Sequence, residues 1–214
     1  MIGQGCKANA KKMALQRLPR SPLVFGKRVK KAHQGSSTPA GQMYSPSKGY
    51  TGVVTCGHGY SLNDKVSIFP AYWTPLEPIG KITAHKFVTL YGSWNDSSFI
   101  KLDNGHSYSG TRYDEICTQT PVVNSNITLR GYNFGTKSAK VTSINASCVT
   151  LNPLMNMGNL IKADKPVYSG DSGGGAIGGT ADGGRTNLII GINHATDSYN
   201  TWLVMGSTVH NGFK

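Results

Sequence analysis

From position 49 onward, apolar residues occur in short runs separated by turn residues. The runs are rich in β-branched and aromatic side chains, which favours strands, and none continues with the 3.6-residue period of a long helix. Many short strands at this spacing favour a sandwich or a barrel over a sheet of alternating strands and helices. The sequence therefore predicts an all-β fold, with strands at Gly52–Thr55, Val66–Phe69, Ile79–Ala84, Phe87–Tyr91, Ser97–Leu102, Ile127–Gly131, Lys140–Ile144, Ala176–Ile177, Leu188–Ile192 and Trp202–Val204.

The first 48 residues form a separate, basic segment. The chain has a net charge of +12 at pH 7, and positions 1–48 supply ten Lys or Arg and no acidic residue. Three interpretations stay open: an arm that binds nucleic acid or an anionic surface, a remnant of a pro-segment or polyprotein junction, and a first strand with a solvated face. We expect a short helix at Ala8–Leu18 and a packed edge strand at Leu23–Val29. The segment lacks the apolar core of a signal peptide or a membrane span, so no membrane partner is expected.

The four cysteines argue against a zinc site. Cys6, Cys56, Cys117 and Cys148 contain no Cys-x-x-Cys pair. A disulfide between Cys117 and Cys148 and a set of free, buried thiols are both compatible with the spacing. The redox compartment therefore stays open.

The strongest chemical signal is a serine within a glycine turn. In Gly170–Gly174 (Gly-Asp-Ser-Gly-Gly) such a turn lets two backbone N–H groups point at one spot beside Ser172. A serine hydroxyl needs a base to become a nucleophile, and the base needs a carboxylate to orient it. His58 ends an apolar run and Asp96 begins another, which gives the order His, Asp, Ser.

Two other carboxylates are weaker candidates for the third member of this set. Asp64 lies in Asn-Asp-Lys and Asp103 in Asp-Asn-Gly, and both sequences are typical of exposed hairpin turns. Asp96 instead precedes the strand-like run at Ser97–Leu102. We therefore expect Asp96 to be the orienting carboxylate.

These motifs resemble those of the chymotrypsin-like serine proteases. Thr55–His58 (Thr-Cys-Gly-His) resembles the family's Thr-Ala-Ala/Gly-His, Gly170–Gly174 matches its Gly-Asp-Ser-Gly-Gly, and Asp96–Leu102 resembles its Asp-x-Ala-Phe-Val-x-Leu. The similarity runs from about Gly49 to Val209. It is greatest to the short bacterial branch that includes streptogrisins, alpha-lytic protease and glutamyl endopeptidases.

The resemblance implies two antiparallel six-stranded β-barrels with an active site in the cleft between them. The first barrel would span residues 49–110 and carry His58 and Asp96, and the second would span 111–214 and carry Ser172, with the connection near 103–121. The implied activity is that of a serine endopeptidase acting through an acyl-enzyme. The N–H groups of Gly170 and Ser172 would form the oxyanion hole. No cofactor and no metal are expected, and the expected partner of the monomeric enzyme is a polypeptide substrate.

The same resemblance suggests the substrate pocket. Pro166 stands where trypsin-like enzymes have an aspartate, so a preference for Lys or Arg is not expected. Glutamyl endopeptidases carry Gly-x-His on the strand of His194, but here the histidine comes one position late and needs a local bulge or shift to match. With hydroxyls from Ser169 and Thr196, these residues predict cleavage after Glu or Gln, with a small or apolar preference as the alternative.

Competing interpretations concern the activity, the nucleotide motif and the source. A catalytically silent binding module on the same fold is the alternative from another class, because Cys56 and Gly175 depart from the family pattern. Residues 173–178 fit G-x-G-x-x-G, but a serine turn precedes them and no helix is expected to follow, so a dinucleotide site is rejected. The resemblance favours a secreted bacterial enzyme, and a viral polyprotein protease is the alternative source.

Overall fold

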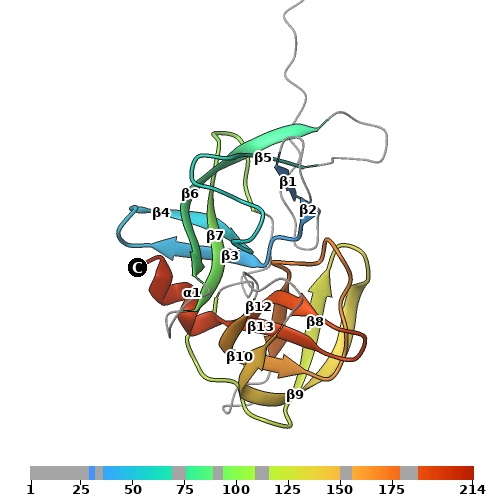
Figure 1. Ribbon diagram of the computed structural model, residues 1–214. Coiled ribbons are helices and arrows are strands. Elements are labelled where there is room, and N and C mark those ends of the chain that lie inside the picture. Colours follow the sequence, from blue (N-terminus) through green and yellow to red (C-terminus); the bar gives the residue numbers. More distant parts are fainter. Residues whose placement is uncertain are drawn as a thin grey trace, which may run out of the picture.

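The computed structural model describes residues 29–31, 36–68, 76–88, 94–108, 116–149, 156–178 and 188–214. Within these residues the chain forms antiparallel β-structure in two lobes and one short helix, as Figure 1 shows. The predicted all-β class is confirmed. The predicted helix at Ala8–Leu18 lies outside the described residues, as does all of the predicted edge strand Leu23–Val29 except its last residue.

The first lobe is a seven-stranded sheet in the order β2-β1-β5-β6-β7-β4-β3. Only three residues, Thr38–Ala40, separate the outermost strands β2 and β3, so the two ends of the sheet curl toward each other. The strands of this lobe are β1 (Val29–Lys31), β2 (Ser36–Ser37), β3 (Gly41–Ser45), β4 (Tyr50–Thr55), β5 (Lys65–Ile68), β6 (Glu77–Val88) and β7 (Asn95–Leu102).

The second lobe is a closed six-stranded barrel in the order β10-β13-β12-β11-β8-β9. This part of the fold has the predicted strand number. Its strands are β8 (Asn126–Gly131), β9 (Gly135–Cys148), β10 (Met157–Ala163), β11 (Gly175–Gly178), β12 (Ile189–Thr196) and β13 (Thr201–Met205). Residues 175–178 of the rejected nucleotide motif form strand β11, which agrees with that rejection.

Each lobe has an apolar core, and a third cluster joins the two lobes. Val54 and Phe99 from the first lobe pack with Leu160 and Ile192 from the second in this joint cluster. Helix α1 (Gly206–Gly212) follows β13 and lies against the first lobe, where Ser45 Oγ donates to the carbonyl of Phe213.

Two sequence expectations differ from the structure. The predicted strand Ile79–Ala84 and the start of the predicted strand Phe87–Tyr91 lie in one strand, β6, which runs from Glu77 to Val88 past a register shift opposite Ile82 and Ala84, while residues 89–91 lie outside the described residues. Strands β1–β3 lie within the segment 1–48 but pair into the first sheet, so this lobe begins by residue 29 rather than at 49. Of the two alternatives for the cysteines, the structure has the buried thiols, because Cys117 and Cys148 form no disulfide and pack in different clusters.

Helix α1, the one helix among the described residues, has seven residues and is too short to cross a membrane.

Candidate active site

His58 follows β4 in a turn that packs against the start of β7. A Cβ on Gly57 would lie 2.6 Å from the Lys86 carbonyl oxygen and 2.9 Å from the Ser97 nitrogen, so only glycine fits there. This close approach lets the N–H groups of Gly57 and His58 donate to Asp96 Oδ1 at 2.7 and 2.6 Å. The glycine of the histidine motif therefore fixes the position of His58 relative to Asp96.

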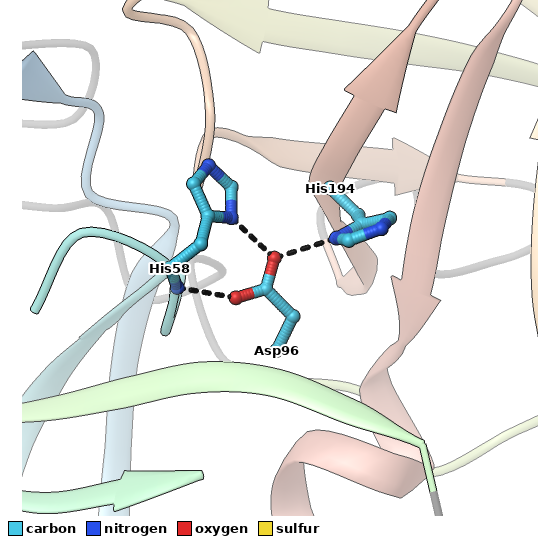
Figure 2. Close-up of side chains that lie close together, drawn as sticks. All are labelled: His58, Asp96 and His194. Atoms are coloured by element: carbon cyan, nitrogen blue, oxygen red, sulfur yellow. Dashed lines mark hydrogen bonds and ion pairs between the residues drawn. The ribbon is translucent and has the colours of Figure 1, made fainter. Parts of the chain in front are cut away.

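Asp96 has no exposed surface, and its carboxylate accepts four hydrogen bonds. Besides the two amides on Oδ1, His58 Nδ1 lies 2.5 Å and His194 Nδ1 lies 2.6 Å from Oδ2. Figure 2 shows the two imidazole rings on either side of this oxygen. Four bonds fill the acceptor capacity of an ionised carboxylate, which offsets the cost of burying its charge.

These contacts determine which nitrogen of His58 can act as a base. An ionised carboxylate only accepts hydrogen bonds, so the Nδ1 atoms of both rings must carry their protons. For neutral His58 this leaves Nε2 unprotonated and able to accept a proton. Because the His58 side chain is 23% exposed, that proton can come from a group outside the core.

The same geometry shifts the pKa values of both groups. Burial would by itself lower the pKa of His58, but the Cys56 sulfur and the Asp96 carboxylate raise it above the usual 6.5. Burial would by itself raise the pKa of Asp96, but the charge of His58 and hydrogen bonds from His194 and His58 hold it well below its usual value. Asp96 therefore stays ionised over the working pH range.

The turn that carries Ser172 contacts the segment just before His58. Gly170 and Gly173 have φ values of +91° and +84°, which a glycine adopts without strain. A Cβ on Gly173 would lie 2.5 Å from the Cys56 nitrogen and would also meet Thr55 Oγ1. The Thr38 N–H donates to the Ser172 carbonyl at 2.8 Å, so the first lobe holds this turn of the second lobe in place.

Two amides of the serine turn are available for a ligand. The N–H groups of Asp171, Gly173 and Gly174 donate to the carbonyls of Tyr168, Asn193 and Asp171. Those of Gly170 and Ser172 donate to no group among the residues that the structure describes. They are the two amides that the family resemblance assigns to an oxyanion hole.

Asp171 fastens the other side of the serine turn. Its buried carboxylate accepts the N–H groups of Asn133 at 2.7 Å and Tyr168 at 3.0 Å. Burial raises the pKa of Asp171, although those hydrogen bonds and the charge of Lys137 act to lower it. Lys137 Nζ lies over the Phe134 and Tyr168 rings and donates to the Pro166 carbonyl at 2.7 Å. The chain leading to Ser172 is thus held at several points before any substrate binds.

No protein-family model and no curated protein sequence matches this chain. Solved structures do match: a Nocardiopsis protease has a TM-score of 0.69 at 17% identity, covering 90% of this chain and 97% of that one. A glutamic-acid-specific serine protease gives 0.68 at 18% identity with 89% and 97% coverage, and the chymotrypsin of Cellulomonas bogoriensis gives 0.66 at 16% with 90% and 96%. The fold is that of the bacterial chymotrypsin-like serine proteases.

Within this chymotrypsin-like fold, the structure places the other candidate carboxylates outside the site. Asp64 accepts the N–H of Ser61 in its own turn, and Asp103 is exposed in the turn after β7.

Among the described residues Ser172 Oγ has no hydrogen-bond partner, and its side chain is half-buried. Catalytic hydrogen bonds are often long before substrate binds, so this geometry is compatible with a nucleophilic Ser172.

Some of the residues expected to form a substrate pocket make hydrogen bonds to other groups of the protein. His194 is fully buried against Asp96, and Thr196 Oγ1 accepts the Val167 N–H and donates to the Asn200 carbonyl at 2.8 Å. The expected bulge exists, because Asn193 pairs with Leu203 and Ala195 with Trp202, which leaves His194 as the extra residue. A bulge re-aims the side chain that it carries. Here the ring of His194 bonds Asp96, which corrects the expectation that it faces the substrate.

Two functional neighbours had no signal in the sequence. His85 on β6 places Nε2 at 3.1 Å from the Gly57 carbonyl, so it contacts the His58 turn. Asn193 donates its side-chain Nδ2 to the carbonyls of Arg130 and Asp171, beside the serine turn. Both positions become significant only through the strand register and the contact between the lobes.

His58, Asp96 and His194 also raise the question of a metal, because their donor atoms converge. Ligand atoms that share one tetrahedral zinc lie about 3.3 Å apart when each is about 2.0 Å from the ion. The two nitrogen–oxygen distances here are 2.5 and 2.6 Å, which are hydrogen-bond distances. The distances between these three side chains fit hydrogen bonds and do not fit the ligands of one metal ion.

Gly173→Ala tests how tightly the two lobes meet at the serine turn. The new methyl group would collide with Thr55 and Cys56 at a φ of +84°, so we expect a loss of about 3 kcal/mol in stability, or about 10 °C in Tm. Gly59→Ala is the matched control, because Gly59 has the same φ with no atom within 4 Å of the added carbon. Equal melting temperatures for the two variants would contradict the close contact.

Proposed function

We propose that this protein is a serine endopeptidase that hydrolyses peptide bonds through an acyl-enzyme on Ser172. The observation that supports this most directly is the pairing of a buried, oriented His58 with a serine turn whose two unused amides come from Gly170 and Ser172. The fold, shared with bacterial serine proteases, is compatible with this proposal.

In the first half-reaction, Ser172 Oγ attacks the peptide carbonyl carbon while His58 Nε2 takes its proton. The negative charge that develops on the carbonyl oxygen is bound by the N–H groups of Gly170 and Ser172. His58 then gives the proton to the leaving amine, which breaks the C–N bond and leaves the acyl group on Ser172.

In the second half-reaction, water attacks the ester carbonyl and His58 again accepts a proton, which it returns to Ser172 Oγ as the acid leaves. Asp96 keeps its charge throughout and stabilises the imidazolium that forms in each step. The four hydrogen bonds to Asp96 prevent the carboxylate from rotating as that charge comes and goes.

Labelling with a fluorophosphonate tests this proposal, because the reagent forms a stable bond only with an activated serine. We expect one label per native chain, located on Ser172 by mass spectrometry, and none on Ser172→Ala or on the heat-denatured protein. A folded wild-type protein that takes up no label would instead favour a silent binding module on the same fold.

The pH dependence of hydrolysis follows from the raised pKa of His58. Only neutral His58 can accept the serine proton, so activity is low below the pKa and rises as pH increases through it. Because the pKa is raised, the half-maximal point of kcat/KM on the acid side should lie above pH 6.5. A profile that is already level at pH 6 would contradict this assignment of the base.

The preference for Glu or Gln has less support than the reaction itself. His194 and Thr196 make internal hydrogen bonds and cannot offer the same donors to a substrate while they do so. One similar structure is described as a glutamic-acid-specific protease that uses a histidine triad in substrate binding, but at 18% identity it supports the fold alone. Profiling the cleavage sites in a denatured protein mixture decides between an acidic or amide preference and an apolar one.

A further inference from the structure

His194 is a buried histidine for which peptide hydrolysis as derived above requires no chemical step. It is the extra residue of the β12 bulge, its side chain has no exposed surface, and its Nδ1 lies 2.6 Å from Asp96 Oδ2. His58 Nδ1 bonds the same oxygen at 2.5 Å from the other side (Figure 2). One carboxylate oxygen thus serves two imidazoles, whose ring centroids are 5.9 Å apart.

The residue before His194 holds the other half of the site. The N–H and C=O of Asn193 bond Gly174 and Gly173, directly after Ser172, and its side-chain amide bonds the Asp171 carbonyl. Two consecutive residues of β12 therefore contact the serine turn of the second lobe and the carboxylate of the first. We propose that His194 is a positioning residue that holds Asp96 in line with His58 and, through Asn193, couples the carboxylate to the serine turn.

This proposal rests on the serine-endopeptidase function and deepens it, since His194 acts through Asp96 and touches no substrate. The titratable groups around the His58 ring are Asp96 on β7, His194 on β12 and Cys56 in its own turn, with His85 on β6 contacting that turn. Among the residues that the structure describes, Asp96 is the one carboxylate that hydrogen-bonds both rings. Removing one donor changes how strongly that charge acts on the other ring.

A pair of substitutions isolates the donor of His194. Asn keeps a nitrogen donor at the bonded position of Nδ1, whereas Leu fills similar space without a donor. We expect His194→Leu to lower kcat by about 10- to 100-fold with KM within about twofold, because a buried charge loses one hydrogen bond. We expect His194→Asn to recover most of that loss. Cleavage-site preference should be the same in both variants and the wild type.

The pH at half-maximal activity distinguishes the loss of a hydrogen bond to Asp96 from a simple loss of packing, which would not change it. Without the donor from His194, Asp96 attracts a protonated His58 more strongly, so the acid limb of the His194→Leu profile should move upward by about half a pH unit or more. The His194→Asn limb should stay near that of the wild type.

Three outcomes would overturn the proposal. One is a His194→Leu enzyme with unchanged kcat, and another is an equal loss in folded Asn and Leu variants. The third is a variant that changes cleavage preference or KM at constant kcat, which would return His194 to the substrate pocket.

A measurement on the Ser172→Ala protein keeps the inference testable if the Leu variant does not fold or the protein is no peptidase. Long-range ¹H–¹⁵N spectra of the histidine rings report which nitrogen carries the proton. We expect protonated Nδ1 in both His58 and His194. A His194 ring protonated only at Nε2 would refute the shared-oxygen arrangement. If the Ser172→Ala protein shows the expected tautomers but the wild-type protein takes up no fluorophosphonate, only the proposed function is refuted.

Discussion

Ser172→Ala should abolish peptide hydrolysis while leaving the fold intact. Serine proteases that lose the nucleophile lose on the order of 10⁶-fold in kcat, because the oxyanion hole and substrate binding alone supply only a small part of the rate. The fold should persist, since Ser172 Oγ bonds no described group and the bond from Thr38 goes to the backbone carbonyl. The measurements are kcat/KM on a peptide ester or amide and a thermal melt.

Ser198→Ala is the control for this variant. Ser198 is an exposed serine in the loop between β12 and β13 and should be replaced without any change in rate. Wild-type turnover by Ser172→Ala would show that Ser172 is not the nucleophile, and it would also contradict an acyl-enzyme on this residue.

Asp96→Asn should cost about 10⁴-fold in kcat. Two backbone N–H groups bond Oδ1, so the asparagine must place its carbonyl oxygen there and turn its NH₂ group toward the two imidazoles. An NH₂ group cannot accept the Nδ1 protons of His58 and His194, so the rings must change tautomer. His58 then carries its proton on Nε2 and cannot take one from serine.

The same change should lower stability by about 1–3 kcal/mol, the cost of a buried donor that loses its partner. Asp103→Asn is the matched control, because Asp103 is the exposed carboxylate that the sequence left as an alternative. It should leave both kcat and Tm unchanged. A large loss in Asp103→Asn with little effect of Asp96→Asn would reverse the assignment of the carboxylate.

Local patterns in the sequence were sufficient for the strand-rich class and for the segments that meet at the site. Gly57 and Gly173 stand in the two short motifs that drew attention to His58 and Ser172, and Asp96 directly precedes a strand-like run. These features depend on residues close together in the chain. The pattern of apolar runs indicated five of the six strands of the second barrel and did not indicate β10, so the number six came from the family resemblance.

A strand before residue 49 was one of three interpretations of the basic segment, and the sequence could not choose between them because the partners of β1–β3 lie elsewhere in the chain. The strand β1 pairs with β5, more than thirty residues later, and its basic residues give it no apolar alternation. The choice between a disulfide and separate thiols for Cys117 and Cys148 was likewise open in the sequence, since the distance between two thiols depends on which cluster each joins.

His194 shows most clearly what the sequence determined and what only the tertiary structure decided. The family resemblance implied a bulge or shift at His194, and the residues around it left the direction of the ring open between pocket and core. A bulge adds a residue without specifying which group the side chain meets. Only the packing of β12 against β7 of the other lobe decided that, by bringing the buried oxygen of Asp96 within 2.6 Å of the ring. Hydrogen bonds between residues 98 positions apart depend on the assembled fold, which local propensity does not encode.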